Sequence, residues 1–180
     1  ISLNKKLTIF KMKNKERSKN TSIKICGITN SEDALLAAQL GADALGFILY
    51  EKSPRYVSPE LIKVASNALN EKEHPLKVGV FVNESIDKII NISKDCNLNT
   101  IQLHGDESIA YVKKLKERLI KTIPTIPIIK AFPIKSHADL NPINEYKKLI
   151  DYILLDTKSE TQYGGTGTVF DWDIAKEAKK

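Results

Sequence analysis

From residue 22 onward, short apolar segments alternate with longer segments of helical spacing, and this alternation is the strongest constraint on the fold. The short segments are rich in Ile, Val, Leu and Phe, which is typical of strands buried on both faces. They recur about every 26 residues, and this strand–helix–strand order predicts a parallel sheet with helical crossovers. The predicted strands are 22–26, 43–49, 76–82, 100–104, 126–132 and 152–156.

The segments between these strands carry helix start and stop signals. Ser31 and Ser58 are good N-caps, Pro59 suits a first helical position, and Gly41 suits a helix end. The predicted helices are 31–40, 59–69, 85–96, 106–119 and 136–149, the last interrupted by Pro142. Both an open doubly wound sheet and a closed barrel fit this order. The first strand is not followed by a GxGxxG motif, which disfavours a dinucleotide-binding sheet.

Charge divides the chain into two regions. Residues 1–20 hold seven Lys/Arg and one Glu, so the rest of the chain holds 21 basic and 21 acidic side chains. We therefore predict a basic, disordered leader over residues 1–21, with contact to an anionic surface as the alternative. The neutral remainder, residues 22–180, predicts one domain without a nucleic-acid partner.

Both ends of the chain suggest a fragment. The chain begins at Ile1 and its only methionine is Met12, so Met12 is the expected natural start. At the other end, the segment 175–180 has the composition of the first turns of a helix. These features predict a domain that is truncated at its C-terminus.

The two cysteines and the hydropathy of the chain indicate the cellular environment in which the protein is expected to work. Cys26 and Cys96 form no CxxC and have no His at ligand spacing, which excludes the common zinc patterns. They predict a reducing, cytoplasmic environment. No apolar run approaches the roughly 18 residues of a membrane span, so no membrane association is expected.

Polar residues gather where the predicted strands end and the following loops begin. In a βα barrel, the carboxyl ends of the strands are where active sites are built. The candidate site residues selected in this way are Lys24, Cys26, Arg55, Asn83, Gln102, His104 and Asp156.

Short motifs occur in a defined order along the chain: KICGIT at 24–29, SPRYV at 53–57, VGVF at 78–81, IQLHG at 101–105, LLD at 154–156, GGTG at 164–167 and FDW at 170–172. In this order they resemble the phosphoribosylanthranilate isomerase family. The resemblance implies an α/β fold of the (β/α)8 TIM-barrel type. Eight units of about 26 residues would reach about residue 229, so we expect about six βα units here, with a gap between strands six and one. We further expect residues 1–180 alone to be inactive and prone to aggregate.

The resemblance also implies a reaction, the Amadori rearrangement of N-(5-phosphoribosyl)anthranilate in tryptophan biosynthesis. An acid protonates the ring oxygen of this phosphosugar and a base removes the proton from C2, so neither a cofactor nor a metal is expected. By resemblance, Cys26 is the general base and Asp156 the general acid. The acid role would need a pKa of Asp156 raised by burial.

The remaining assignments concern substrate binding. By resemblance, Arg55 is expected to bind the benzoate carboxylate of the substrate by donating two parallel hydrogen bonds. Gln102 and His104 share one strand face and are expected to contact the substrate. Gly165 and Gly167 belong to a glycine-rich loop that is expected to close one side of the phosphate site.

Three alternatives stay open at this point. Cys26, taken alone, is a small apolar strand residue, and Asp156 is an N-cap or an ion-paired loop residue. Another phosphosugar barrel, such as a ribulose-phosphate epimerase, would need more metal-ligating residues than His104 and Asp156. The chain could also be a non-catalytic fragment. The sequence does not distinguish a monomer from a homodimer.

Overall fold

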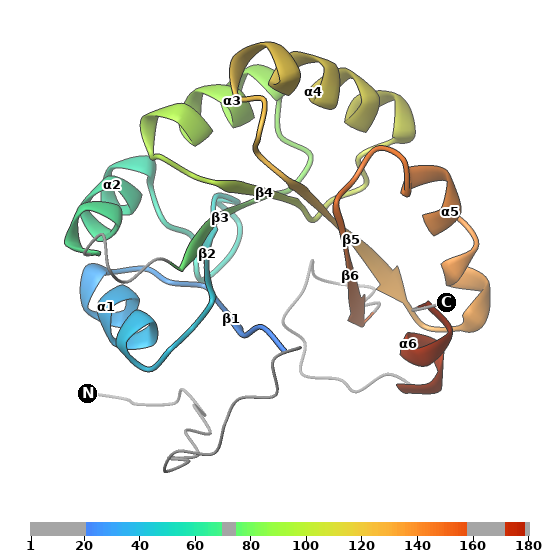
Figure 1. Ribbon diagram of the computed structural model, residues 1–180, viewed down its shortest axis with the longest axis horizontal. Coiled ribbons are helices and arrows are strands. Elements are labelled where there is room, and N and C mark those ends of the chain that lie inside the picture. Colours follow the sequence, from blue (N-terminus) through green and yellow to red (C-terminus); the bar gives the residue numbers. More distant parts are fainter. Residues whose placement is uncertain (1–20, 70–74, 158–171, 179–180) are drawn as a thin grey trace.

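The structure is a computed structural model that describes residues 21–69, 75–157 and 172–178. Within these residues, six strands alternate with helices along the chain (Figure 1). The strands are β1 (Lys24–Cys26), β2 (Ala44–Ile48), β3 (Leu76–Phe81), β4 (Thr100–Leu103), β5 (Ile128–Ile134) and β6 (Tyr152–Thr157). The helices are α1 (Ser31–Gln39), α2 (Pro59–Ala68), α3 (Ile86–Asp95), α4 (Ile109–Thr122), the 3-10 turn η1 (His137–Leu140), α5 (Ile143–Tyr146) and α6 (Trp172–Ala178).

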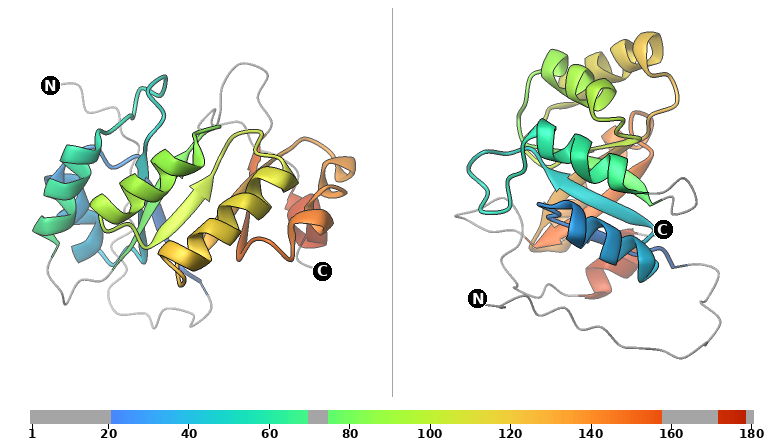
Figure 2. Two further views of the ribbon diagram at one scale, coloured as in Figure 1. Left: turned by 90° about the horizontal axis from the view of Figure 1, so that it is seen from above. Right: turned by 90° about the vertical axis from the view of Figure 1, so that its left-hand side faces the viewer.

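All six strands are parallel and lie in the order β1-β2-β3-β4-β5-β6, so each strand pairs with its neighbour in sequence. The sheet is curved, and the helices lie on its convex side (Figure 1). Figure 2 shows α2, α3 and α4 side by side across this outer surface. This is the arrangement of six consecutive units of a (β/α)8 barrel, and within the described residues β1 and β6 are its two edges.

The two faces of the sheet bury different side chains because successive residues of a strand point to opposite faces. A large cluster between sheet and helices contains Phe47, Phe81 and Leu103, all fully buried. A smaller cluster, which includes Ala44 and Val80, lies on the other, concave face. The concave face corresponds to the interior of the barrel, and it carries the polar residues considered below.

The predicted strands are confirmed with boundaries shifted by no more than two residues, as are the first three helices. The helix predicted at 106–119 begins later, at Ile109, because the side chain of Ser108 caps the helix by accepting from the N–H of Tyr111. The helix predicted at 136–149 with an interruption at Pro142 is present only as two short segments. Pro142 lacks an N–H to donate, and the segment forms η1 and the four-residue α5 on either side of it.

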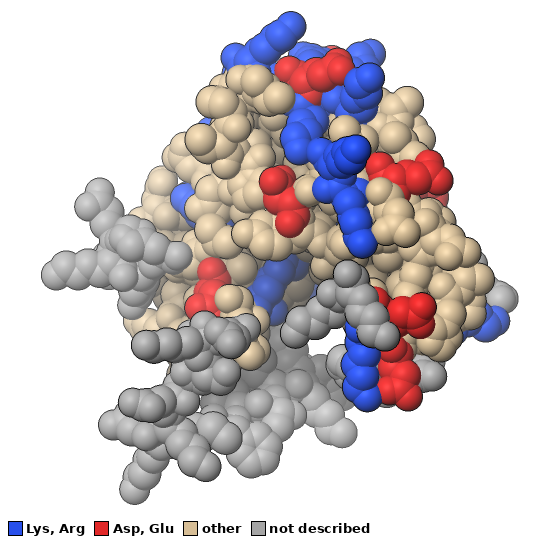
Figure 3. All heavy atoms as spheres, turned by 45° about the vertical axis from the view of Figure 1, so that its right-hand side comes forward, with Lys and Arg blue, Asp and Glu red and all other residues tan. Residues whose placement is uncertain are grey.

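Charge is unevenly distributed over the outer surface. The sequence of α4, IAYVKKLKERLIKT, has five basic residues and one acidic residue. Figure 3 shows basic side chains gathered at the top of the molecule, where Figure 1 places α3 and α4, with acidic side chains among them. An ion pair on this surface joins Arg118 of α4 to Asp87 of α3. No helix of the described residues is long and apolar enough to cross a membrane.

Candidate active site

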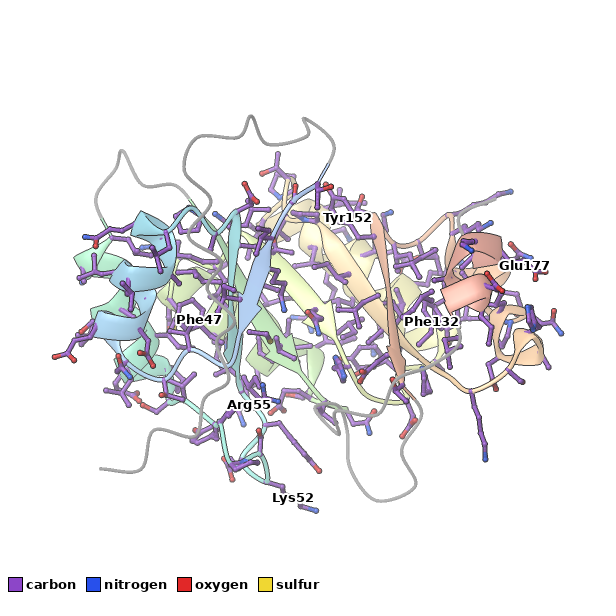
Figure 4. The ribbon with its side chains drawn as sticks, turned by 90° about the horizontal axis from the view of Figure 1, so that it is seen from below. Phe47, Lys52, Arg55, Phe132, Tyr152 and Glu177 are labelled. Atoms are coloured by element: carbon purple, nitrogen blue, oxygen red, sulfur yellow. The ribbon has the colours of Figure 1, made fainter. Side chains whose placement is uncertain are left out.

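The carboxyl ends of the six strands meet at one end of the sheet. Arg55, in the loop after β2, lies at this end, whereas Tyr152, the first residue of β6, lies at the opposite end (Figure 4). Cys26 is the last residue of β1, His104 directly follows β4, and Asp156 is the penultimate residue of β6. The fold thus brings the predicted site residues of four different βα units to the same end.

Cys26 lies against a glycine of the neighbouring strand. Gly46 is its partner in the parallel register, and a Cβ atom added to Gly46 would lie 2.6 Å from the Cys26 sulfur. After Cys26 the chain turns back, since the N–H groups of Gly27 and Ile28 both donate to the carbonyl of Gly46, at 2.9 and 3.0 Å. Gly27 has φ +91°, a conformation that favours glycine. The turn leaves the Cys26 side chain exposed.

Arg55 lies over this turn. A Cβ atom on Gly27 would be 2.8 Å from Cδ of Arg55, so the absence of a side chain at Gly27 makes room for the guanidinium stem. Nη1 of Arg55 donates to the carbonyl oxygen of Cys26 at 3.5 Å. Among the described residues no other hydrogen bond engages the exposed guanidinium, so its remaining donors can bind an anionic group beside Cys26.

Gln102, His104 and Asp156 form a chain of hydrogen bonds across the sheet. Nε2 of His104 lies 3.0 Å from Oδ2 of Asp156, and Nδ1 of His104 lies 2.7 Å from Nε2 of Gln102. An ionised carboxylate only accepts hydrogen bonds, so the hydrogen lies on Nε2 of His104. Nδ1 of the neutral ring then accepts from the amide of Gln102.

The hydrogen bonds between these three side chains overturn the expected direction of the pKa shift of Asp156. Asp156 was expected to have a raised pKa, but the hydrogen bond from His104 lowers the pKa of the Asp156 carboxyl. Partial burial acts in the opposite direction and is outweighed by this bond, the charge interaction with His104 and the backbone N–H of Thr157. Without a ligand, Asp156 is therefore a carboxylate that accepts from His104.

A buried ion pair, Lys130 with Glu107, supports the site from the outer side of the sheet. Nζ of Lys130 lies 3.1 Å from Oε2 of Glu107, with side chains only 4% and 1% exposed. The carboxylate of Glu107 accepts from the N–H groups of Asn83 and Gly105, and Lys130 donates to the carbonyl of Gly105 at 2.8 Å. We call Lys130 and Glu107 the loop clamp, because they join the loops after β3 and β4.

Sequence reasoning selected Asn83 but missed the loop clamp. The available signal was a lysine inside an otherwise apolar strand, in the segment Ile-Ile-Lys-Ala-Phe at 128–132. A charge there requires a buried partner. The partner could not be chosen from the sequence, because Glu107 lies 23 positions earlier and belongs to a different βα unit.

The second cysteine and a second aspartate near β6 lie away from this end, and two predicted residues lie outside the described residues. Cys96 is buried at the end of α3, and burial raises the pKa of its thiol. Asp151 precedes β6 at the far end and accepts from the N–H of Ile128. Gly165 and Gly167 lie outside the described residues, so their assignment stays a prediction. Within the described ranges, no three His, Cys, Asp or Glu residues are grouped so as to hold a metal ion.

A curved parallel sheet with titratable side chains at the carboxyl ends of its strands is the arrangement found in βα-barrel enzymes. Comparison of the sequence with known protein families identifies which family of βα-barrel enzymes this is. Residues 23–180 match the family described as N-(5'phosphoribosyl)anthranilate (PRA) isomerase. The chain belongs to this family, which rules out the ribulose-phosphate epimerase alternative.

Individual relatives agree with the family match. The N-(5'-phosphoribosyl)anthranilate isomerase of Thermotoga neapolitana is 45% identical over 152 residues, which are 84% of this chain and 68% of the relative. The crystal structure of the Thermotoga maritima enzyme has a TM-score of 0.72 at 43% identity, covering 85% of this chain and 69% of that one. A structure of a phosphoribosyl anthranilate isomerase in complex with reduced 1-(o-carboxyphenylamino)-1-deoxyribulose 5-phosphate has a TM-score of 0.66 at 42% identity, covering 76% and 64%.

Proposed function

We propose that this chain takes part in the isomerisation of N-(5-phosphoribosyl)anthranilate to 1-(2-carboxyphenylamino)-1-deoxyribulose 5-phosphate, with Cys26 as the base and Asp156, assisted by His104, as the acid. The observation that carries the proposal is the position of these three residues at the carboxyl ends of β1, β4 and β6 in a member of this family. The ligand is a small phosphosugar. The two free cysteines fit a reducing cytoplasm.

The base step uses the exposed sulfur of Cys26. A thiolate removes the proton from C2 of the opened sugar, and the electron pair left on C2 forms the enolamine. Exposure of Cys26 gives a ligand direct access to the sulfur. Buried Cys96 has no such access.

The acid step must account for the lowered pKa of Asp156. We propose that His104 and Asp156 take up one proton as a pair and that Asp156 delivers it to the ring oxygen as the sugar opens. A protonated His104 carries hydrogens on both ring nitrogens, so it needs an acceptor at Nδ1. Oε1 of Gln102 is buried and has no hydrogen-bond partner among the described residues. Rotation of the Gln102 amide would supply that acceptor.

Substrate binding is assigned to the guanidinium of Arg55. It lies against the carbonyl of Cys26, so a benzoate carboxylate held there would be adjacent to the proposed base. The glycine-rich loop with Gly165 and Gly167 remains the predicted cover of the phosphate. In this proposal the protein supplies charge matching and two proton-transfer groups.

The decisive test is Cys26→Ala in the protein expressed from its whole reading frame. We expect turnover to fall by about 10² or more while substrate binding is retained, because the positioned base is lost. Steady-state kinetics with N-(5-phosphoribosyl)anthranilate measure both quantities. Cys96→Ala is the matched control and should keep nearly normal turnover. Near-normal turnover of Cys26→Ala would refute the assignment of the base.

A further inference from the structure

Lys24 is a charged residue of β1 that the proposed reaction does not use. It lies two residues before Cys26, so both side chains point to the same face of the strand. A Cβ atom on Gly46 would lie 2.6 Å from Sγ of Cys26 and 2.9 Å from Nζ of Lys24. Two atoms at these distances from one point are at most 5.5 Å apart. The bare backbone of Gly46 therefore allows an ammonium group and the sulfur to lie together.

Two charged groups of the described residues are seen to approach Cys26, and both are cationic. Lys24 approaches along the same strand, and Arg55 approaches from the loop after β2, with Nη1 3.5 Å from the Cys26 carbonyl. The neighbouring strand β2 contributes the uncharged Gly46. Within the ranges that the structure describes, the half-buried Lys24 forms no ion pair with a carboxylate. Its charge is thus not neutralised by a described residue.

We propose that Lys24 is a positioning residue for Cys26, whose ammonium group stabilises the thiolate form of the side chain. The proposal rests on the proposed role of Cys26 as the base. A free thiol is only about 3% thiolate at pH 7, so a base of this type gains from a nearby positive charge. A cation within about 5.5 Å of the sulfur favours the thiolate several-fold even with water-like screening.

Removal of the charge should slow reactions of the Cys26 sulfur. Part of the loss in thiolate is offset, because a thiolate with a less stabilised charge is the stronger nucleophile. We therefore expect Lys24→Met to reduce the rate of Cys26 alkylation at pH 7 by between about twofold and tenfold. The difference should shrink as the pH rises, because at high pH the thiol ionises without assistance.

The experiment measures alkylation by iodoacetamide in the protein expressed from its whole reading frame, with the modified cysteine identified by peptide mass spectrometry. Cys26→Ser gives the background from buried Cys96. Lys24→Arg retains a positive charge and should keep most of the rate. Lys77→Met is the matched control, because Lys77 is also a strand lysine but is the register partner of Leu45, whose side chain packs in the cluster between the sheet and the helices.

Alkylation distinguishes this role from others, because it requires neither the substrate nor turnover. An unchanged alkylation rate in Lys24→Met would overturn the proposal, even if the isomerase activity fell, since Lys24 would then act on the substrate. An equal decrease in Lys77→Met would also overturn it. Near-normal turnover of Cys26→Ala would refute the proposed base but leave the alkylation result intact.

A measurement on the unsubstituted protein covers the case in which Lys24→Met does not fold. At pH 7, Cys26 should react faster in the folded protein than in the same protein unfolded in urea, because unfolding separates the sulfur from Lys24 and Arg55. Since Cys26 is exposed in the folded chain, access does not limit its reaction. A slower reaction in the folded state would contradict the proposal.

Discussion

At the residue scale, His104 and Asp156 share one hydrogen bond whose strength depends on pH. The lowered pKa of Asp156 means that its carboxyl group stays ionised to a lower pH in the folded protein than in the unfolded chain. A lowered pKa contributes stability above the unfolded value, about 3.9, and this contribution is lost as the pH falls through the folded value. The pair should therefore stabilise the fold at neutral pH and lose this effect in acid.

A double-mutant cycle of His104→Ala and Asp156→Ala tests this coupling by urea unfolding. At pH 7 we expect a coupling free energy of about 1 kcal/mol, since the Asp156 side chain is 29% exposed to screening water. The coupling should decrease as the pH falls through the lowered pKa of Asp156 in the folded protein, because protonation removes the charge of the carboxylate. A coupling that does not change at any acidic pH at which the protein stays folded would show that packing joins these residues rather than charge.

The sequence predicted the position of these site residues but not their state. Cys26 and Asp156 each end an apolar strand, and parallel strands bring their carboxyl ends together, so a common location followed. The hydrogen bond between His104 and Asp156 joins residues 52 positions apart, and it reverses the expected direction of the pKa shift of Asp156. Such a pairing depends on side-chain contacts across the barrel, which strand periodicity does not contain.

At the element scale, the loop clamp of Lys130 and Glu107 ties β5 to the loops that follow β3 and β4. Lys130→Met leaves the Glu107 carboxylate buried without its cation, and we expect this to cost about 3–5 kcal/mol of unfolding free energy. Urea unfolding of the protein expressed from its whole reading frame measures the change. Because Gly105 follows His104 directly, catalytic turnover should fall as well.

The exposed pair of Lys88 and Glu84 provides the control for the loop clamp. Lys88 is 51% exposed, and Lys88→Met removes a surface partner of Glu84 without leaving a fully buried charge. We expect this substitution to cost less than about 1 kcal/mol. Equal losses in the two variants would mean that Lys130 and Glu107 contribute no more than a surface pair does.

Element boundaries followed from the sequence wherever a local signal was strong. The cap at Ser58 fixed the start of α2, as its side-chain hydrogen bond confirms. The cap predicted at Ser31 is wrong, because Asn30 caps α1 by accepting from the N–H of Asp33 and Ser31 is the first helical residue. The helix predicted at 136–149 is shorter than expected, because Pro142, which was expected only to interrupt it, removes a backbone donor and leaves a four-residue segment on either side. The loop clamp was not predictable, because it depends on how three βα units pack.

At the scale of the whole molecule, the described sheet has two edges. β1 pairs with β2 and β6 pairs with β5, so within the described residues each edge strand has one unpaired side. Unpaired edges of a sheet can pair with another chain. Two large apolar side chains add to this tendency: Ile23, beside β1, is 46% exposed, and Tyr152, on β6, is 58% exposed.

We therefore expect the 180-residue polypeptide, produced by itself, to self-associate through these edges. A charge on an edge strand opposes such pairing, so Tyr152→Lys should reduce the associated fraction by roughly half or more. Leu61→Lys is the matched control, since Leu61 is 50% exposed but lies on α2, away from both edges. Sedimentation velocity over a range of concentrations measures the associated fraction. A monomeric chain at all concentrations, or equal effects of the two substitutions, would show that the edges do not drive association.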